Sequence, residues 1–130
     1  MVCSLPIYSA NKQLPKTQGK IFEVSSLKEL EAFLEDQKIV FIDFYKDDCS
    51  PCKQFKPLYE NWAVLLNKQI IFIKVNASNP ETDDLCKKFK ITGFPTLIVL
   101  DSQRKINRYI GMEEIKAMNI KRFFLAYAED

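Results

Sequence analysis

The sequence predicts an α/β fold in which a central, mostly parallel β-sheet packs against helices. Strand-like and helix-like segments alternate along most of the chain, which is typical of parallel sheets. Two of the strand-like segments, residues 39–45 and 70–75, are apolar on both faces, as strands inside a parallel sheet are. The chain has 130 residues, of which 47% are hydrophobic, so it is long enough for one domain with its own core.

The start of the chain differs from the rest. Residues 1–19 contain Pro6, Pro15 and Gly19 among mixed polar residues and show no apolar periodicity. Such a segment is typical of a mobile or loosely packed arm. We therefore expect an N-terminal arm over residues 1–19 and a folded domain over residues 20–130.

The domain is expected to begin with a strand, a helix and a second strand. Residues 21–24 are a short strand candidate. Ser26 and Glu29 have the S-x-x-E spacing of a capping box, in which each side chain binds a free backbone N–H of the other. We therefore expect a helix from this point to about Asp36. Residues 39–45 form the first buried strand.

Helix and strand continue to alternate through the middle of the domain. Residues 49–52 open a helix whose apolar residues, at helical spacing, reach Leu66. Residues 70–75 are the second buried strand. A further helix is expected over residues 80–89, because an asparagine cap is followed there by a proline, which the first helical turn tolerates.

A hairpin and a helix are expected to close the domain. Residues 96–100 and 106–110 are strand candidates joined by a short polar segment, so they should pair as an antiparallel hairpin. Gly111 ends the second of these strands, and a last helix follows, with apolar positions that reach Tyr127. The hairpin adds an antiparallel strand to an otherwise parallel sheet.

The composition excludes several kinds of function. The net charge is +2 and neither sign forms a long block, so we expect no binding to nucleic acid or to membranes. Histidine is absent, so no Ser-His or Cys-His catalytic pair can form, and neither standard phosphate-binding loop occurs. No apolar run approaches the ~18–20 residues of a membrane span, and the first residues lack the pattern of a signal peptide. We therefore expect a cytoplasmic location.

The sequence has four cysteines, Cys3, Cys49, Cys52 and Cys86. Four are too few for a disulfide scaffold in a chain of this length, and only Cys49 and Cys52 are close, in a C-x-x-C motif. A zinc site would normally need a second close pair or histidines, so no metal site is expected. We expect Cys86 to be a small core residue of a helix, and we assign no role to Cys3.

The C-x-x-C motif follows a buried strand and opens a helix, which predicts redox chemistry. The free N–H groups and partial positive charge of a helix N-terminus stabilise a thiolate. The three-residue spacing brings both sulfurs to the same side of the first turn, within reach of a disulfide. We expect Cys49, at the exposed turn, to attack and Cys52, one turn deeper, to resolve. Pro51 should stiffen the turn between them.

Further residues along the chain resemble the thioredoxin family. The resemblance covers residues 20–128, in order. The segments that carry it are 41–45, 49–53, Pro57, Lys74, 93–96 and Gly111. It implies a thioredoxin fold, with a mixed, mostly parallel sheet flanked by helices on both faces. It also implies that a reversible Cys49–Cys52 dithiol/disulfide is the redox centre, so no further cofactor is expected.

The resemblance also implies roles for residues outside the motif. Asp43 would be the buried carboxylate near the resolving cysteine, and Lys74 a core lysine that supports it. Pro95 would be a cis-proline beside the disulfide. Gly93 and Gly111 would lie next to the site.

Two of these residues have structural alternatives. Asp43 could be held in an ion pair with Lys74 on the neighbouring strand, although a carboxylate buried among apolar residues is costly and such groups concentrate at functional sites. Pro95 could be an ordinary trans proline of a turn, although it begins an apolar strand, where its missing N–H needs a reason.

Two residues beside the motif depart from the family pattern. Asp48 stands where thioredoxins usually carry Trp, and Phe94 fills a position that usually holds a smaller residue. A flat apolar docking surface would thus become acidic on one side and aromatic on the other. We expect the substrate to contact Asp48, Phe94, Gly93 and Gly111, and we expect Asp48 and Phe94 to set the choice of partner.

Together these observations predict a thiol–disulfide oxidoreductase that reduces protein disulfides. An upstream thiol reductase would regenerate the dithiol, and we expect the protein to be a monomer. One alternative is a thioredoxin-fold interaction or redox-sensing module that binds a dedicated partner with little reductase turnover. Another is an oxidase or isomerase in an oxidising compartment, which a measured reduction potential would distinguish.

Overall fold

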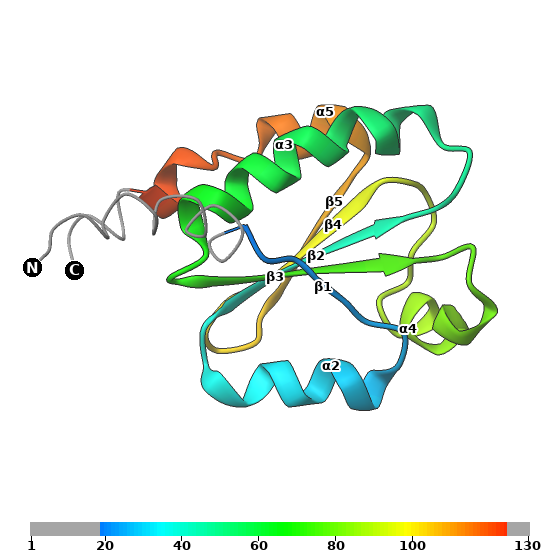
Figure 1. Ribbon diagram of the computed structural model, residues 1–130, viewed down its shortest axis with the longest axis horizontal. Helices are drawn as coiled ribbons and strands as arrows, with labels where there is room; N and C mark the ends of the chain where they lie inside the picture. The colour runs from blue at the N-terminus through cyan, green and yellow to red at the C-terminus, as the bar shows by residue number, and fades with distance from the viewer. Residues whose placement is uncertain (1–18, 125–130) are drawn as a thin grey trace, which may run out of the picture.

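The computed structural model describes residues 19–124 (Figure 1). Of the expected N-terminal arm, only Gly19 lies within this range. Cys3 and Tyr127 lie outside the described residues. Among the described residues, no helix is both long enough and apolar enough to cross a membrane.

Within residues 19–124, five strands form one mixed sheet in the order β1-β3-β2-β4-β5. β3 pairs in parallel with both β1 and β2, whereas β4 is antiparallel to both β2 and β5. This arrangement confirms the expected sheet with its closing antiparallel hairpin. The strands are β1 (Phe22–Glu23), β2 (Ile39–Tyr45), β3 (Ile70–Asn76), β4 (Thr96–Leu100) and β5 (Ile106–Ile110).

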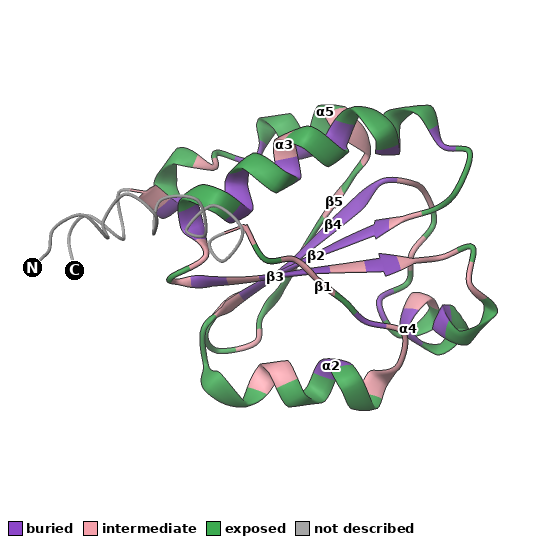
Figure 2. Ribbon diagram, viewed as in Figure 1, coloured by how far each residue is buried: buried purple, intermediate pink, exposed green. Residues whose placement is uncertain are grey.

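Helices cover both faces of the sheet, as expected. α3 and α5 lie on one face, and α2 and α4 lie on the other (Figure 1). The buried side of each helix faces the sheet, and the solvent side is exposed (Figure 2). The helices are α2 (Leu27–Phe33), α3 (Ser50–Leu66), α4 (Asp83–Lys88) and α5 (Gly111–Ala117), with 3₁₀ turns at Leu34–Asp36 and Pro80–Thr82.

The sheet divides the apolar core into two clusters, because successive side chains of a strand point to opposite faces. Phe41 of β2 packs under α3 and α5, where its ring centroid lies 5.2 Å from that of Phe72. Ile42 and Phe44 belong to the cluster under α2 and α4. Asp43 alternates with Ile42 and Phe44, so its carboxyl is on the α3 side of the sheet.

The predicted cap of α2 is confirmed in part. Ser26 Oγ accepts a hydrogen bond from the N–H of Glu29 at 3.2 Å, as a capping residue should. In the return direction, Glu29 Oε1 accepts from the N–H of Ser25, one residue before the cap, at 2.8 Å.

The expectation of one continuous last helix is wrong. α5 ends at Ala117, and Met118 then takes an extended conformation with ψ 121°. The side chain of Asn119 accepts a hydrogen bond from the N–H of Lys121 at 3.2 Å, so it caps a new helical turn. Apolar periodicity continues across this break, which is why the sequence alone did not reveal it. Phe123 is buried beyond the break, under α3 and α5.

Candidate active site

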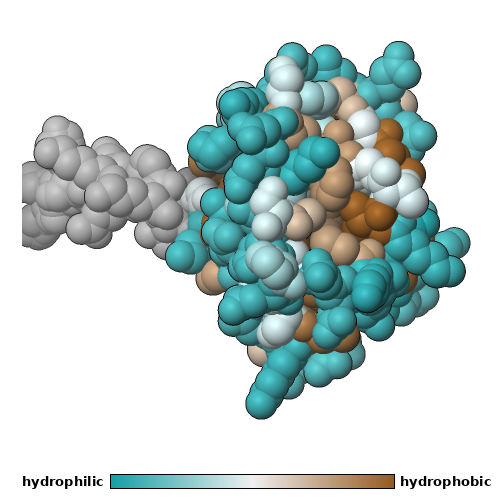
Figure 3. All heavy atoms as spheres, turned by 90° about the vertical axis from the view of Figure 1, so that its right-hand side faces the viewer, coloured by the Kyte–Doolittle hydropathy of each residue, from teal (hydrophilic) through white to brown (hydrophobic). Residues whose placement is uncertain are grey.

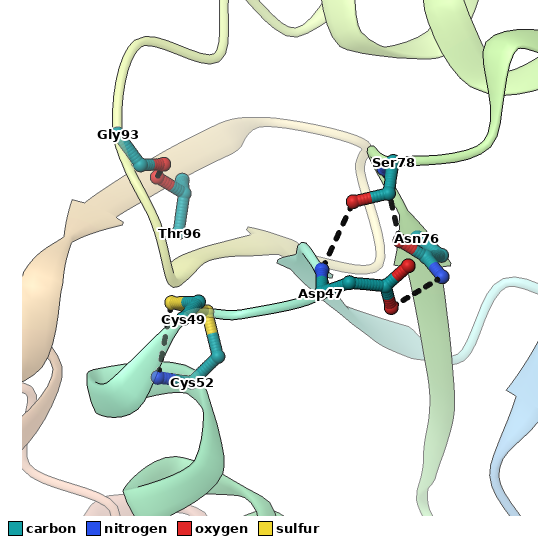
Figure 4. Close-up of a disulfide and its surroundings, with 7 residues drawn as sticks. All are labelled: Asp47, Cys49, Cys52, Asn76, Ser78, Gly93 and Thr96. Carbon is teal, nitrogen blue, oxygen red and sulfur yellow. Dashed lines mark hydrogen bonds between the residues drawn. A yellow bond between two sulfur atoms is a disulfide. The ribbon is translucent and has the colours of Figure 1, made fainter.

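The C-x-x-C motif lies at the edge of the sheet where β2 ends (Figure 4). The chain leaves β2 at Tyr45, crosses residues 46–48 and enters α3 at Ser50. Cys49 and Cys52 are joined by a disulfide, and their Cα atoms are 5.2 Å apart. The expected pairing of these two cysteines is therefore confirmed.

Cys49 is the N-cap residue of α3. Its backbone is extended (φ −122°, ψ 105°), and its Sγ accepts a hydrogen bond from the N–H of Cys52 at 3.2 Å. Pro51 occupies the first turn, where its missing N–H removes no helical hydrogen bond. A thiolate on Cys49 would be stabilised by this N–H group and by the helix dipole.

The exposure of the two cysteines differs from our expectation. We expected Cys49 at an exposed turn and Cys52 deeper, but their exposed fractions are 6% and 7%. The disulfide packs the two sulfurs together, so exposure does not distinguish them. What distinguishes them is contact with the helix terminus, because it is the sulfur of Cys49 that accepts the N–H hydrogen bond.

Asp43 is a buried carboxyl group on the α3 side of β2. It is 7% exposed, and its Oδ1 has no hydrogen-bond partner among the described residues. Burial raises the pKa of Asp43 to about 7, although the positive charge of Lys74 acts in the opposite direction. Near neutral pH this carboxyl group can therefore both accept and release a proton.

Lys74 lies beside Asp43 in the sheet, because the two residues are register partners in β3 and β2. Its Nζ is 4.0 Å from Glu23 Oε1. Among residues 19–124, Lys74 therefore forms an ion pair with Glu23 and none with Asp43. The alternative in which Lys74 neutralises Asp43 through a direct ion pair is therefore wrong. Lys74 acts on Asp43 only through its longer-range positive charge.

A cavity of about 340 Å³ connects Asp43 with the disulfide. Cys52 lines this cavity, and Cys49 does not. Its remaining lining combines charged side chains with the apolar and aromatic side chains of Ile21, Tyr45 and Tyr59. The lining includes Asp43, Lys46, Asp47, Asp48, Cys52 and Lys74.

The loop before β4 lies on the other side of the disulfide. The Phe94–Pro95 peptide bond is cis, as the resemblance implies, so the alternative of a trans proline is wrong. Thr96 Oγ donates a hydrogen bond to Gly93 O at 2.7 Å, and Figure 4 shows this part of the loop close to Cys49. The carbonyl of Pro95 accepts from the N–H of Gly111 at 2.8 Å.

Glycine is favoured at positions 93 and 111 for two different physical reasons. Gly111 has a φ of +83°, a conformation that side chains disfavour. A Cβ on Gly93 would lie 3.2 Å from Cγ2 of Ile110, so the close packing of the loop against β5 favours glycine there. Ile110 is itself exposed. This end of the molecule shows apolar surface framed by hydrophilic side chains (Figure 3).

The two residues that depart from the family pattern lie in different segments, Asp48 between β2 and Cys49 and Phe94 in the loop before β4. Asp48 is exposed and has a φ of +54°. Lys46 Nζ lies 5.3 Å from the centroid of the half-buried Phe94 ring, which is a cation–π distance. The aromatic side of the predicted docking surface therefore also carries a positive charge.

Sequence reasoning missed three residues of this region. Asn76 and Ser78 hold Asp47 by hydrogen bonds (Figure 4). Tyr59 of α3 donates to the carbonyls of Phe41 at 3.0 Å and of Ile73 at 2.7 Å, which ties α3 to β2 and β3. Asn76 ends β3 and Ser78 follows it closely, which was a usable signal, because the ends of neighbouring parallel strands meet at one edge of a sheet.

Cys86 lies apart from this chemistry. Cys86 is partly buried and packs against the α2–α4 side of the core, and burial raises the pKa of its thiol. Residues 19–124 contain no cluster of three or more side chains placed to hold a metal ion.

These features define a class of protein. A disulfide at a helix N-terminus, between a cis-proline loop and a cavity with a buried carboxyl group, is the centre of a thiol–disulfide oxidoreductase. The redox chemistry resides in the Cys49–Cys52 pair of the chain itself. The sheet order and the helices on both faces are those of the thioredoxin fold.

Comparison with known proteins identifies the family. The family model described as Thioredoxin matches residues 21–123, so the chain belongs to the thioredoxin family. Thioredoxin-1 of Caenorhabditis elegans is 44% identical over 78 residues, which are 60% of this chain and 65% of that protein. A thioredoxin of Echinococcus granulosus is 33% identical over 85 residues, or 65% of this chain and 77% of that protein.

A solved structure agrees with this assignment. The crystal structure of thioredoxin f from spinach chloroplast, in its short form, is 26% identical to this chain and superposes with a TM-score of 0.69. The match covers 81% of this chain and 94% of that one.

Proposed function

We propose that this thiol–disulfide oxidoreductase reduces protein disulfides, with Cys49 as the attacking and Cys52 as the resolving residue. The observation that carries the proposal is the hydrogen bond from the N–H of Cys52 to Cys49 Sγ at the start of α3. This contact favours the thiolate of Cys49, and the thiolate is the form that attacks a disulfide.

The reaction takes two exchange steps. The Cys49 thiolate attacks one sulfur of the target disulfide, a mixed disulfide forms, and the other target sulfur leaves as a thiolate. Cys52 then loses its proton to Asp43, which lines the same cavity, and attacks Cys49 Sγ. The target leaves with both sulfurs reduced, and Cys49 and Cys52 are oxidised to the disulfide.

Asp43 supports the second step through its position and its raised pKa. A proton acceptor works best when its pKa is near the working pH. Lys74 tunes this group by its positive charge, and Pro51 and Pro95 shape the two turns around the sulfurs.

The docking surface for the target is proposed to include Gly93, Phe94 and Gly111 on one side and Asp48 on the other. These residues flank Cys49, where a target must lie to present its disulfide. A carboxylate at Asp48 would favour targets with basic residues near the disulfide.

The cellular setting is also part of the proposal. We place the protein in the cytoplasm as a monomer, where an upstream thiol reductase would return two electrons to the disulfide. The small net charge of +2 supports partners that are neither nucleic acid nor membrane.

Trapping of the mixed disulfide tests the assignment of roles. Cys52→Ser, treated with a protein disulfide substrate, should accumulate a covalent complex through Cys49 and lose multiple turnover. Cys49→Ser should form no such complex, and Cys86→Ser is the matched control that should keep full activity. Accumulation of a complex through Cys52 in the Cys49→Ser variant would reverse the roles.

A further inference from the structure

Asp47 belongs to a hydrogen-bonded cluster that the exchange reaction does not use. The Asp47 N–H donates to Ser78 Oγ at 2.9 Å, and Asn76 Nδ2 donates to Asp47 Oδ1 at 3.3 Å. The ring is closed by the N–H of Ser78, which donates to Asn76 Oδ1 at 2.9 Å (Figure 4). We call these three residues the Asp47 cluster.

The Asp47 cluster is fixed to the rest of the fold. Thr82 Oγ donates to the carbonyl of Asn76 at 3.0 Å, and Thr82 is almost completely buried. The N–H of Ala77 donates to the carbonyl of Tyr45 at 2.7 Å. Hydrogen bonds to the end of β3 therefore fix the segment that leads from β2 to Cys49.

The direction of the Asp47 side chain is the informative feature. Figure 4 shows its carboxylate turned toward Asn76, on the opposite side of its backbone from the two sulfurs. Asp47 is only two residues from Cys49 in the sequence. A carboxylate close to a thiolate disfavours the thiolate, because like charges repel.

Other charged side chains surround the site, and most have partners. Lys46 lies over Phe94. The lysine and glutamate pairs are Lys56 with Glu60 at 3.0 Å and Lys74 with Glu23 at 4.0 Å. Asp43 on β2, together with Asp48 and Lys53, completes the charged groups around the sulfurs. Of the two acidic residues just before Cys49, the described contacts hold the carboxylate of Asp47 and leave that of Asp48 exposed.

We propose that Asn76 and Ser78 are positioning residues: Asn76 holds the Asp47 carboxylate and Ser78 holds the Asp47 backbone N–H, so that the negative charge stays against the end of β3 and away from the sulfur of Cys49. Of the two acidic residues just before Cys49, only Asp48 then opposes the attacking thiolate. This inference rests on the proposed role of Cys49 as the attacking residue.

The test is a double-mutant cycle read by alkylation. The reduced protein is treated with iodoacetamide, which is uncharged, and the labelling rate of each cysteine is followed by mass spectrometry as a function of pH. Asn76→Ala should lower the rate at Cys49 near pH 6 by about threefold to tenfold, because the freed carboxylate reduces the thiolate fraction. Ser78→Ala should act in the same direction.

A neutral residue at position 47 provides the decisive comparison. In the background of Asp47→Asn, the Asn76→Ala change should leave the labelling rate of Cys49 unchanged, because no charge is released. Asn61→Ala, the same change at an exposed position of α3, is the control and should have no effect in either background. The effect of Asn76→Ala should also shrink at high salt.

Each other outcome contradicts a distinct part of the interpretation. An equal fall in both backgrounds would mean that Asn76 supports only the fold of the loop. No fall with Asn76→Ala and Ser78→Ala would overturn the positioning role. Preferential labelling of Cys52 in the parent protein would instead overturn the proposed function, and it is read before any variant is made.

Discussion

The two sulfurs of the disulfide are equally buried but have different surroundings. Cys49 caps α3, accepts an N–H hydrogen bond and lies beside the cis-proline loop (Figure 4). Cys52 lines the cavity that contains Asp43. In the proposed mechanism, one side of the disulfide stabilises negative charge and carries the docking surface, and the other supplies a proton acceptor. If the proposed roles hold, the contacts of each sulfur, and not its exposure, separate attack from resolution.

The largest effect is expected from loss of the proton acceptor on the Cys52 side of the disulfide. Asp43→Asn should slow release of the target from the mixed disulfide by roughly tenfold to a hundredfold near pH 8, because Cys52 loses its general base. Since burial raises the pKa of Asp43 to about 7, the parent rate should rise as pH passes through this value. Single-turnover release between pH 6 and 9 measures both effects.

A matched control separates this role from a general loss of charge. Asp84→Asn is the same substitution at an exposed position of α4, and it should leave the release rate unchanged. If Asp43→Asn released the target as fast as the parent over the whole range, the cavity side of the disulfide would have no catalytic function.

The same carboxyl group should make stability depend on pH. The ordinary pKa of an aspartate is ~3.9 in an unfolded chain, and burial raises that of folded Asp43 to about 7. Between these values the folded state holds a proton that the unfolded state has lost, so the free energy of unfolding decreases as pH rises from ~4 to ~7. Below pH 4 both states are protonated, and above pH 7 the full loss is present.

Asp43→Asn should remove this pH dependence. The free energy of unfolding of the variant should equal that of the parent near pH 4. At pH 8 it should be higher than that of the parent by about 2–4 kcal/mol. Denaturant unfolding of the disulfide form measures this without titration of Cys49 or Cys52. A difference that is constant across pH would contradict a buried, titrating Asp43.

The smallest effect is expected from the exposed charge of Asp48, on the proposed docking side of the disulfide. Asp48→Asn removes the exposed charge and keeps a residue that tolerates the φ of +54°. It should reduce the preference for a basic over an acidic disulfide peptide by about twofold to fivefold at low salt, mainly through the association rate. The preference should fade at high salt, since exposed charges are screened. Equal rates for both peptides in parent and variant would remove Asp48 from partner choice.

Much of the site could be predicted because its parts are marked by unusual local sequence. Asp43 stands out as the one charge in an apolar strand, and Cys49 and Cys52 open a helix directly after it. Pro95 stands at the start of another buried strand. A buried carboxylate, a C-x-x-C motif at a helix start and a proline at a strand start are each costly or rare in an ordinary core. Each can therefore be recognised from a single sequence.

The rest depends on contacts between distant segments, which periodicity does not report. Asn76 and Ser78 look like ordinary residues of a strand end, and their hydrogen bonds to Asp47 appear only when β2 and β3 are adjacent. The partner of Lys74 was missed for a similar reason, because β1 brings Glu23 to the other side of β3. The sulfur exposure was missed because it is a property of packing.

The direction of β4 separates the parts of the chain that can change in length from those that cannot. Because β4 is antiparallel to β2, its first residue, Thr96, is paired with Phe44 beside the disulfide, and its last, Leu100, is paired with Val40 at the far edge. The β4–β5 turn therefore extends away from the site, and inserted residues there leave the geometry of both sulfurs intact. One residue added within β2 before Asp43 would instead exchange the two faces of the strand and turn its carboxyl toward α2 and α4. Natural length variation among relatives should therefore concentrate at this distal turn.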